Sequence, residues 1–322
     1  MGDRVSEYGQ PMKLTAEIDD LPSDLSLDGA HARSRASDFM ELTKARLNLM
    51  VLITTMIGFV VAAQNGTIAV PIDWWLLMQT LIGTGLCAAG ASVFNQALEY
   101  RYDAMMSRTA DRPIAAGRMT PAEATVFGLL LCACGLASLF LTVNALSAIL
   151  CLSTILLYVF VYTPLKRMTT LNTLVGAIPG AIPPVIGYVA VSGKLDWEAF
   201  GLFAILFCWQ MPHFLAIAIL CRDDYAAAGY KMMPVVDRTL ARTSRWIVAF
   251  GVLLIAASLM PVWTRPTSVS YIVVASLLGL GFLAAGVRCA LTPTRTTART
   301  AFFASIVYLP LALGALMIER LL

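Results

Sequence analysis

The stretch from residue 74 to residue 103, WWLLMQTLIGTGLCAAGASVFNQALEYRYD, decides the fold class of this chain. Its first part, residues 74–97, has no charged side chain and is long enough to cross about 30 Å of hydrocarbon as a helix. Nine such apolar runs lie at about 43–63, 74–97, 121–141, 145–164, 170–191, 198–220, 244–263, 269–288 and 300–318. The sequence therefore predicts an all-α membrane protein with nine transmembrane helices.

The composition indicates a chain that is embedded in a lipid bilayer. The 322 residues are 58% hydrophobic and 13% charged, and the mean hydropathy is +0.75. A soluble globular domain has about 25% charged residues, which is about twice the fraction in this chain. We expect membrane lipid to surround the chain and expect no nucleic acid among its partners.

The distribution of lysine and arginine predicts the orientation in the membrane. Most of the 23 basic residues lie before the first run or after the second, fourth, sixth and eighth runs, and the other connections hold Lys194, Arg265 and Arg320. Basic connections stay in the cytoplasm, which predicts a cytoplasmic N-terminus and an external C-terminus. Residues 1–38 are polar and acidic and predict a disordered cytoplasmic tail, followed by one membrane domain over residues 39–322. The tail has neither an apolar signal core nor the acid-poor composition of a mitochondrial presequence, which favours a bacterial inner (plasma) membrane.

The second run continues into a ladder of oxygen-bearing side chains. Asn95, Glu99 and Asp103 are spaced i, i+4, i+8, which places them along one face of a helix that leaves the membrane. Stacked carboxylates repel one another unless a cation lies between them, and ligands that are all oxygens favour a hard ion such as Mg²⁺. Arg108 and Arg112 follow, again four apart, and would clamp a diphosphate. The alternative is a solvated helix end with no bound ion.

A second connection of similar character follows the sixth run. Residues 222–238 combine the acids Asp223 and Asp224 with the bases Arg222 and Lys231. Because four runs separate the two connections, both lie on the same side of the membrane, and we expect their acidic helix ends to face each other. Two carboxylate clusters around one anionic ligand suggest more than one Mg²⁺ and a leaving group that contains phosphorus. The alternative is that Asp–Arg pairs only order the loop.

Two further features suggest a site for a second substrate. Lys166 and Arg167 close the fourth run, where they would either set the topology or meet the carboxylates of an acidic substrate. His213 lies within the sixth run, where an ionisable group usually faces a cavity, although a structural histidine is the alternative. Asp224 follows His213 by about three helical turns, so a continuous helix would place both on one face.

These motifs together resemble the haem O synthases, or protohaem IX farnesyltransferases, which belong to the UbiA-type intramembrane prenyltransferases. The pattern NxxxExxxDxxMxRTxxRP spans Asn95–Pro113, PHF lies at 212–214 and DDYxxAG at 223–229. Lys44, Arg46 and the segment 162–167 also match, and the resemblance covers about residues 38–320. Glu99 stands where the wider superfamily usually has aspartate. Cys221 and Tyr225 replace the outer acids of its second motif, DxxxD.

The resemblance implies nine helices around a central cavity and assigns roles to the residues above. Catalytic residues that hold Mg²⁺ and the diphosphate of farnesyl diphosphate would be Asn95, Glu99, Asp103, Asp223 and Asp224. The charge of the diphosphate would be offset by Arg108, Arg112, Lys166, Arg222 and Lys231. The acceptor would be bound by His213, Arg167, Lys44 and Arg46.

The reaction implied by the resemblance joins a farnesyl group to a vinyl group of haem B, with addition of water, at the cytoplasmic side of the membrane. Haem B is then a substrate and not a prosthetic group. The product haem O would serve haem-copper oxidases, with haem A synthase or a terminal oxidase assembly as partners. Two alternatives stay open: a related enzyme with another aromatic or tetrapyrrole acceptor, and a secondary transporter, which would place its key polar groups near the bilayer midplane.

Overall fold

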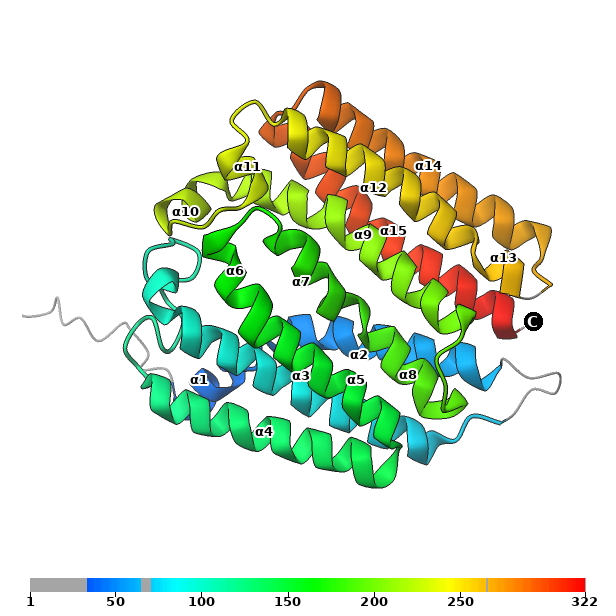
Figure 1. Cartoon of the computed structure of the whole chain (residues 1–322), viewed down its shortest axis with the longest axis horizontal. Coiled ribbons are helices and arrows are strands. Elements are labelled where there is room, and N and C mark those ends of the chain that lie inside the picture. The colour runs from blue at the N-terminus through cyan, green and yellow to red at the C-terminus, as the bar shows by residue number, and fades with distance from the viewer. Residues whose placement is uncertain (1–33, 65–70, 265, 322) are drawn as a thin grey trace, which may run out of the picture. The chain divides into compact units, whose positions relative to one another are not determined.

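Figure 1 shows the computed structural model of the chain, which describes residues 34–64, 71–264 and 266–321. Of the predicted tail at residues 1–38, residues 1–33 lie outside these ranges. Helix α1 (Arg35–Leu42) begins within the last five residues of that predicted tail. In α1, the buried Asp38 accepts a hydrogen bond of 2.9 Å from Arg118, and Phe39 packs edge-on against Phe127.

Nine helical segments of the described chain are long and apolar enough to cross a membrane, as predicted. They are α2 (Ala45–Ala63), α3 (Trp74–Asp103), α4 (Pro121–Thr142), α5 to α6 (Ala145–Met168), α7 to α8 (Asn172–Ser192), α9 (Trp197–Leu220), α12 to α13 (Ala241–Thr264), α14 (Val269–Leu291) and α15 (Arg295–Leu321). Two short helices, α10 (Arg222–Ala227) and α11 (Met233–Val236), lie in the connection after α9.

Polar caps fix where several spans begin. Asp73 accepts a hydrogen bond from the backbone of Leu76 at the start of α3, and Thr120 forms a capping box with Glu123 at the start of α4. Asn144 caps α5 (Ala145–Leu156) in the same way. Each cap satisfies backbone N–H groups that a helix leaves unpaired, and it does so where the chain leaves the apolar layer.

Consecutive spans pack against one another, and the last span returns to the first. The chain runs from α2 through α3 and α4 to the later helices, and α15 contacts α2, so the circuit closes (Figure 1). The first span also packs closely on the second half of the fifth span, α8 (Pro183–Ser192). There the backbones touch: a Cβ added to Gly58 would lie 1.9 Å from the Pro184 carbonyl oxygen, and one added to Gly187 would lie 1.8 Å from that of Thr55. Small residues allow such close approach between membrane helices.

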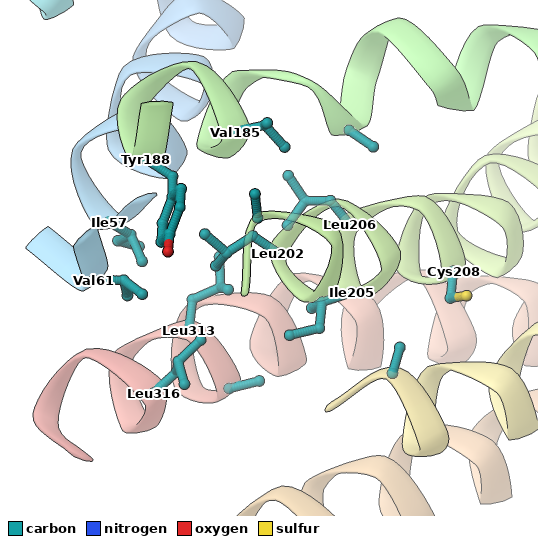
Figure 2. Close-up of a cluster of buried hydrophobic side chains, with 14 of the residues drawn as sticks. Ile57, Val61, Val185, Tyr188, Leu202, Ile205, Leu206, Cys208, Leu313 and Leu316 are labelled. Atoms are coloured by element: carbon teal, nitrogen blue, oxygen red, sulfur yellow. The ribbon is translucent and has the colours of Figure 1, made fainter. Parts of the chain in front are cut away.

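Figure 2 shows the apolar core that fills one end of this circuit. Ile57 and Val61 of α2, Tyr188 of α8, Leu202 of α9 and Leu316 of α15 converge there, and all are buried. The opposite end is the end at which α3, α6 and α9 terminate, and we call it the site face. The cluster packs α2, α8, α9 and α15 against one another, and the polar side chains described below lie at the site face.

Two spans depart from a regular α-helix, one of them beside the site face and the other near the middle of the span. The fourth contains a π-helical turn at Leu157–Tyr162 between α5 and α6 (Thr163–Met168), and the fifth is interrupted at Ile182 between α7 (Asn172–Ala181) and α8. A π-helical turn inside an α-helix frequently marks a functional site. Here it changes which side chains the fourth span directs inward.

Candidate active site

The site face contains a cavity of about 140 Å³. It is lined by Lys44, Asn95, Glu99, Asp103, Met106, Arg108, Arg112, Tyr158, Tyr162, Lys166, Tyr225, Tyr230 and Met232. These residues come from the start of α2, the end of α3, the π-helical turn, α6 and the two long connections. Seven of the fourteen site residues that we predicted from the sequence line this cavity.

The oxygen ladder lies on one face of α3, as the spacing predicts. Asn95, Glu99 and Asp103 are all buried, and helix α3 extends as far as Asp103. Asn95 Nδ2 donates to Glu99 Oε2 over 2.7 Å, so the first two members of the ladder are in contact. Burial of two carboxylates is costly unless cations and hydrogen bonds compensate it.

Each member of the ladder has a cationic partner from another part of the chain. Lys166 Nζ donates to both oxygens of Glu99, at 2.9 and 2.8 Å, and Arg112 donates to Asp103 Oδ2 over 2.6 Å. Lys44 Nζ donates to Asn95 Oδ1 over 3.1 Å. With Arg108, the cavity lining holds four basic side chains and two acidic ones. The excess positive charge suits an anionic ligand.

Lys44 is held in this cavity by an unusual backbone conformation. It lies between α1 and α2 with φ 49° and ψ 51°, in the left-handed region of backbone conformation that residues other than glycine rarely adopt. Burial lowers the pKa of Lys44 to about 7, and the charges of Arg112 and Lys166 act in the same direction. Strained residues cluster at functional sites, and here the strain points an amine at the ladder.

Four tyrosines form much of the remaining wall, and sequence reasoning missed them as site residues. Tyr158 and Tyr162 come from the π-helical turn, where their rings stack at 5.6 Å, and Tyr225 and Tyr230 come from the second connection. Tyr230 donates its hydroxyl to Glu99 Oε1 over 3.0 Å. Burial and the nearby Glu99 carboxylate raise the pKa of Tyr230, so its hydroxyl stays protonated and donates.

The rings of the same tyrosines lie beside the cations. Lys166 Nζ is 4.7 Å from the ring centre of Tyr162, and the Arg108 guanidinium is 5.0 Å from that of Tyr225. An aromatic face attracts positive charge at these distances. The wall therefore combines donors for an anion with π faces for a cation.

The second connection meets the first, as we expected from the topology. Asp224 accepts a hydrogen bond from Ser107 over 3.1 Å, and the Lys231 backbone N–H donates to the Lys166 carbonyl over 2.7 Å. Asp223 and Lys231 are exposed and Arg222 is half-buried. These three residues and Asp224 do not line the cavity described here. Their predicted roles toward metal and diphosphate stay predictions.

The residues predicted to bind the acceptor are dispersed. Lys44 lines the cavity, Arg46 is exposed, and Arg167 donates to the hydroxyl of Tyr102, with its guanidinium 4.5 Å from the Tyr102 ring centre. His213 stacks on Trp209 at 4.6 Å, and its Nδ1 lies 2.7 Å from Ser305 Oγ of α15. It contacts α15 and does not line the cavity described here.

The expected common face of His213 and Asp224 is wrong. Helix α9 ends at Leu220, and Asp224 belongs to the separate helix α10, which begins at Arg222. Cys221 between them has φ −106° and ψ 25°, outside the helical range, so the helical register does not carry across.

The donor atoms of the ladder suit a hard metal ion. Glu99, Asp103 and Asn95 Oδ1 offer oxygen atoms only, which Mg²⁺ prefers. Within the part of the chain that the structure describes, no group of three or more His, Cys, Asp and Glu side chains converges. A metal ion at the ladder would therefore complete its coordination with water or with oxygens of the ligand itself, which is how Mg²⁺ commonly binds beside phosphates.

Over the described residues, a circuit of nine helices that are long and apolar enough to cross a membrane, with an acidic ladder and a cationic wall at one end, defines a polytopic membrane protein with a cavity suited to an anionic ligand. The chain belongs to the UbiA prenyltransferase family, whose model matches residues 51–307. This confirms the predicted family and fold class.

Among its relatives, the chain is 45% identical to the protoheme IX farnesyltransferase of Solibacter usitatus, over 88% of this chain and 98% of the relative. It is 40% identical to that of Opitutus terrae, over 90% and 97% of the two chains. Among solved structures, it is similar to a digeranylgeranylglyceryl phosphate synthase, with a TM-score of 0.72, 16% identity, and 88% and 98% of the two chains covered. A UbiA homolog from Archaeoglobus fulgidus bound to GPP and Mg²⁺ gives a TM-score of 0.58 at 15% identity, over 87% and 99% of the chains.

Proposed function

We propose that this protein transfers the farnesyl group of farnesyl diphosphate to a vinyl group of haem B. The bond between the allylic carbon and the diphosphate oxygen breaks, and the terminal vinyl carbon bonds to the farnesyl carbon. Water then adds to the inner vinyl carbon and loses a proton, which gives a hydroxyethyl-farnesyl side chain and free diphosphate. The product is haem O. Relatives with 40–45% identity that carry the name protoheme IX farnesyltransferase support this acceptor and this donor.

The observation that carries the proposal is the pairing of the ladder with the cations opposite it. Glu99 and Asp103 hold Lys166 and Arg112 in the cavity at 2.8 and 2.6 Å. A diphosphate that enters would draw these cations to its own oxygens and free the carboxylates for a metal ion. Bound Mg²⁺ would neutralise charge on the leaving group. The same side chains therefore pair with one another before the ligand binds, and with the diphosphate and the metal ion afterwards.

The protein then acts mainly by electrostatics and positioning. Lys44, Arg112 and Lys166 stabilise the negative charge that accumulates on the diphosphate as the bond breaks. The rings of Tyr162 and Tyr225 offer π faces beside the carbon that becomes positive. The buried and half-buried side chains that line most of the cavity would limit access of water to that carbon before the vinyl group reacts.

The position of the charged cluster argues against the transporter alternative. The ladder and its cations lie where spans end, whereas a secondary transporter binds its substrate near the bilayer midplane. We further propose that the site face is cytoplasmic and that the membrane is a bacterial inner membrane. Haem O would then pass to haem A synthase or to the assembly of a haem-copper oxidase.

A product assay tests the function directly. The purified protein would be incubated with haem B, farnesyl diphosphate and Mg²⁺, with and without a chelator, and the porphyrins would be resolved by mass spectrometry. We expect haem with a hydroxyethyl-farnesyl group, and only without the chelator. Unchanged haem, with the diphosphate still bound, would remove haem as the acceptor and keep the diphosphate site.

A further inference from the structure

The side-chain amide of Asn95 is the only part of the ladder with both a donor end and an acceptor end. Its Nδ2 donates to Glu99 Oε2 over 2.7 Å and to Thr163 Oγ1 over 3.2 Å, and its Oδ1 accepts from Lys44 over 3.1 Å. In this orientation the oxygen, which can bind a metal ion, faces the cationic side of the cavity. Rotation of the amide by half a turn would present an N–H₂ group there instead.

Thr163 can act only as an acceptor toward this amide. Its hydroxyl donates its single proton to the Tyr158 carbonyl oxygen over 2.9 Å. The backbone N–H of Thr163 is bonded to the same carbonyl in the i to i−5 pattern of the π-helical turn. A hydroxyl whose proton is committed offers lone pairs to a neighbour, so it accepts from Nδ2 and opposes a flipped amide.

The other two partners of Asn95 are expected to change when the ligand binds. Lys44 and Glu99 would be drawn to the diphosphate and to the metal ion, respectively. Thr163 is buried, and its hydroxyl is tied to backbone and not to a group that the ligand recruits. It is therefore the contact that persists in the loaded site.

We propose that Thr163 is a positioning residue that holds the Asn95 amide with Oδ1 toward the cavity, an inference that rests on the proposed role of Asn95 at the metal–diphosphate site. The π-helical turn is what gives Thr163 this role, because it brings the hydroxyl onto the Tyr158 carbonyl. Removal of a group that hydrogen-bonds to a metal ligand and orients it typically lowers metal affinity by about 10- to 100-fold.

The test compares three variants of the full chain in detergent. Thr163→Val removes the hydroxyl and keeps the shape, and the Tyr158 carbonyl stays bonded to the backbone N–H. Thr163→Ser keeps the hydroxyl. The matched control is Thr154→Val in α5, where the Thr154 hydroxyl donates to the Leu150 carbonyl over 2.9 Å and the residue lies outside the cavity lining.

Mn²⁺ binding is measured by electron paramagnetic resonance with saturating farnesyl thiodiphosphate, an unreactive analogue. We expect Thr163→Val to weaken Mn²⁺ binding about 10-fold, with Thr163→Ser and Thr154→Val within about twofold of the wild type. The inference is overturned if Thr163→Val binds Mn²⁺ like the wild type, or if Thr163→Ser is weakened equally. If Thr163→Val does not fold, Thr163→Ala provides the same comparison.

Asn95→Ala separates this inference from the proposed function. Weakened Mn²⁺ binding in Asn95→Ala, together with normal binding in Thr163→Val, removes the role of Thr163 alone. Normal binding in both variants removes Asn95 as a ligand and the inference with it. The product assay stands apart from both results, because it reports on the reaction and not on the affinity for the ion.

Discussion

Lys166 Nζ lies 2.8 Å from one carboxylate oxygen of Glu99 and 2.9 Å from the other, although 67 residues separate them in the chain. Tyr230 donates to the same carboxylate over 3.0 Å. The buried charge of Glu99 is thus compensated from α6 and from the second connection at once. The Glu99 carboxylate thus joins three segments of the site, which are α3, α6 and the second connection.

Removal of Lys166 should affect both stability and activity. Lys166→Met leaves the Glu99 carboxylate buried without its cation, which costs about 3–5 kcal/mol of the free energy of unfolding. Unfolding in mixed micelles, followed by circular dichroism, measures this loss. The double variant Lys166→Met with Glu99→Gln should recover most of the stability and none of the activity. Equal stability of the single and double variants would show that the pair is not coupled.

The charge of Asp103 should matter more than its shape. Asp103→Asn keeps the size of the side chain but removes the charge that a metal ion needs, so turnover should fall by about 10²-fold or more. The rate of haem O formation at saturating substrates measures this. Asp73→Asn, at the opposite end of α3 and outside the cavity lining, is the matched control and should retain activity. Normal turnover in Asp103→Asn would remove this residue from metal binding.

Binding of the diphosphate should depend on pH through Lys44. Its pKa is about 7 and a bound anion favours its charged form, so affinity for farnesyl thiodiphosphate should fall as the pH rises from about 7 to 9. In calorimetric titrations, the affinity of Lys44→Met for the analogue should change less with pH than that of the wild type. Lys44→Arg should bind the analogue at all these pH values. An unchanged slope in Lys44→Met would assign the effect to another group.

The lowered pKa of Lys44 also predicts how the stability of the protein changes with pH. Between pH 7 and the ordinary lysine pKa of 10.5, the unfolded chain binds a proton at Lys44 that the folded chain lacks. The contribution of Lys44 to the free energy of unfolding therefore rises with pH over that window. The difference between the wild type and Lys44→Met, measured by unfolding at several pH values, should change in this direction.

Gly176 should control the position of Tyr162. A Cβ at Gly176 would lie 2.5 and 2.6 Å from two ring carbons of Tyr162, so Gly176→Ala must displace the ring or the helix. We expect a fall in turnover and a loss of about 1–3 kcal/mol of stability from overpacking. Gly281→Ala in α14, where a Cβ would meet nothing within 4 Å, is the matched control. A fully active Gly176→Ala would show that the ring position is not critical.

The sequence predicted the nine spans and the ladder because both depend on local patterns. A span is a run of apolar residues, and the ladder is a repeat of four residues on one helix, so neither needs knowledge of distant contacts. Lys166 and the arginines of the first connection were found by their charge and their neighbourhood.

The remainder of the site depends on contacts that no local pattern encodes. Tyr158 and Tyr162 are ordinary residues of an apolar span until the π-helical turn directs them inward. Arg320 was counted with the loop residues of its side of the membrane, yet it is buried and donates over 2.6 Å to Glu198, a partner 122 residues away. His213 matched a family motif, and its neighbours on α15 became visible only in three dimensions.

The close packing of α2 on α8 at Gly58 and Gly187 has a consequence for how the chain is assembled. Helix α2 packs more extensively on α8 than on its neighbour α3, so during synthesis α2 lacks its main partner until the fifth described span has been made. Synthesis proceeds from the N-terminus, and three intervening spans must enter the bilayer first. The fifth span is thus the step that commits the bundle to its final arrangement. A chain that stops before residue 183 would lack α8, the helix on which its first described span packs most extensively.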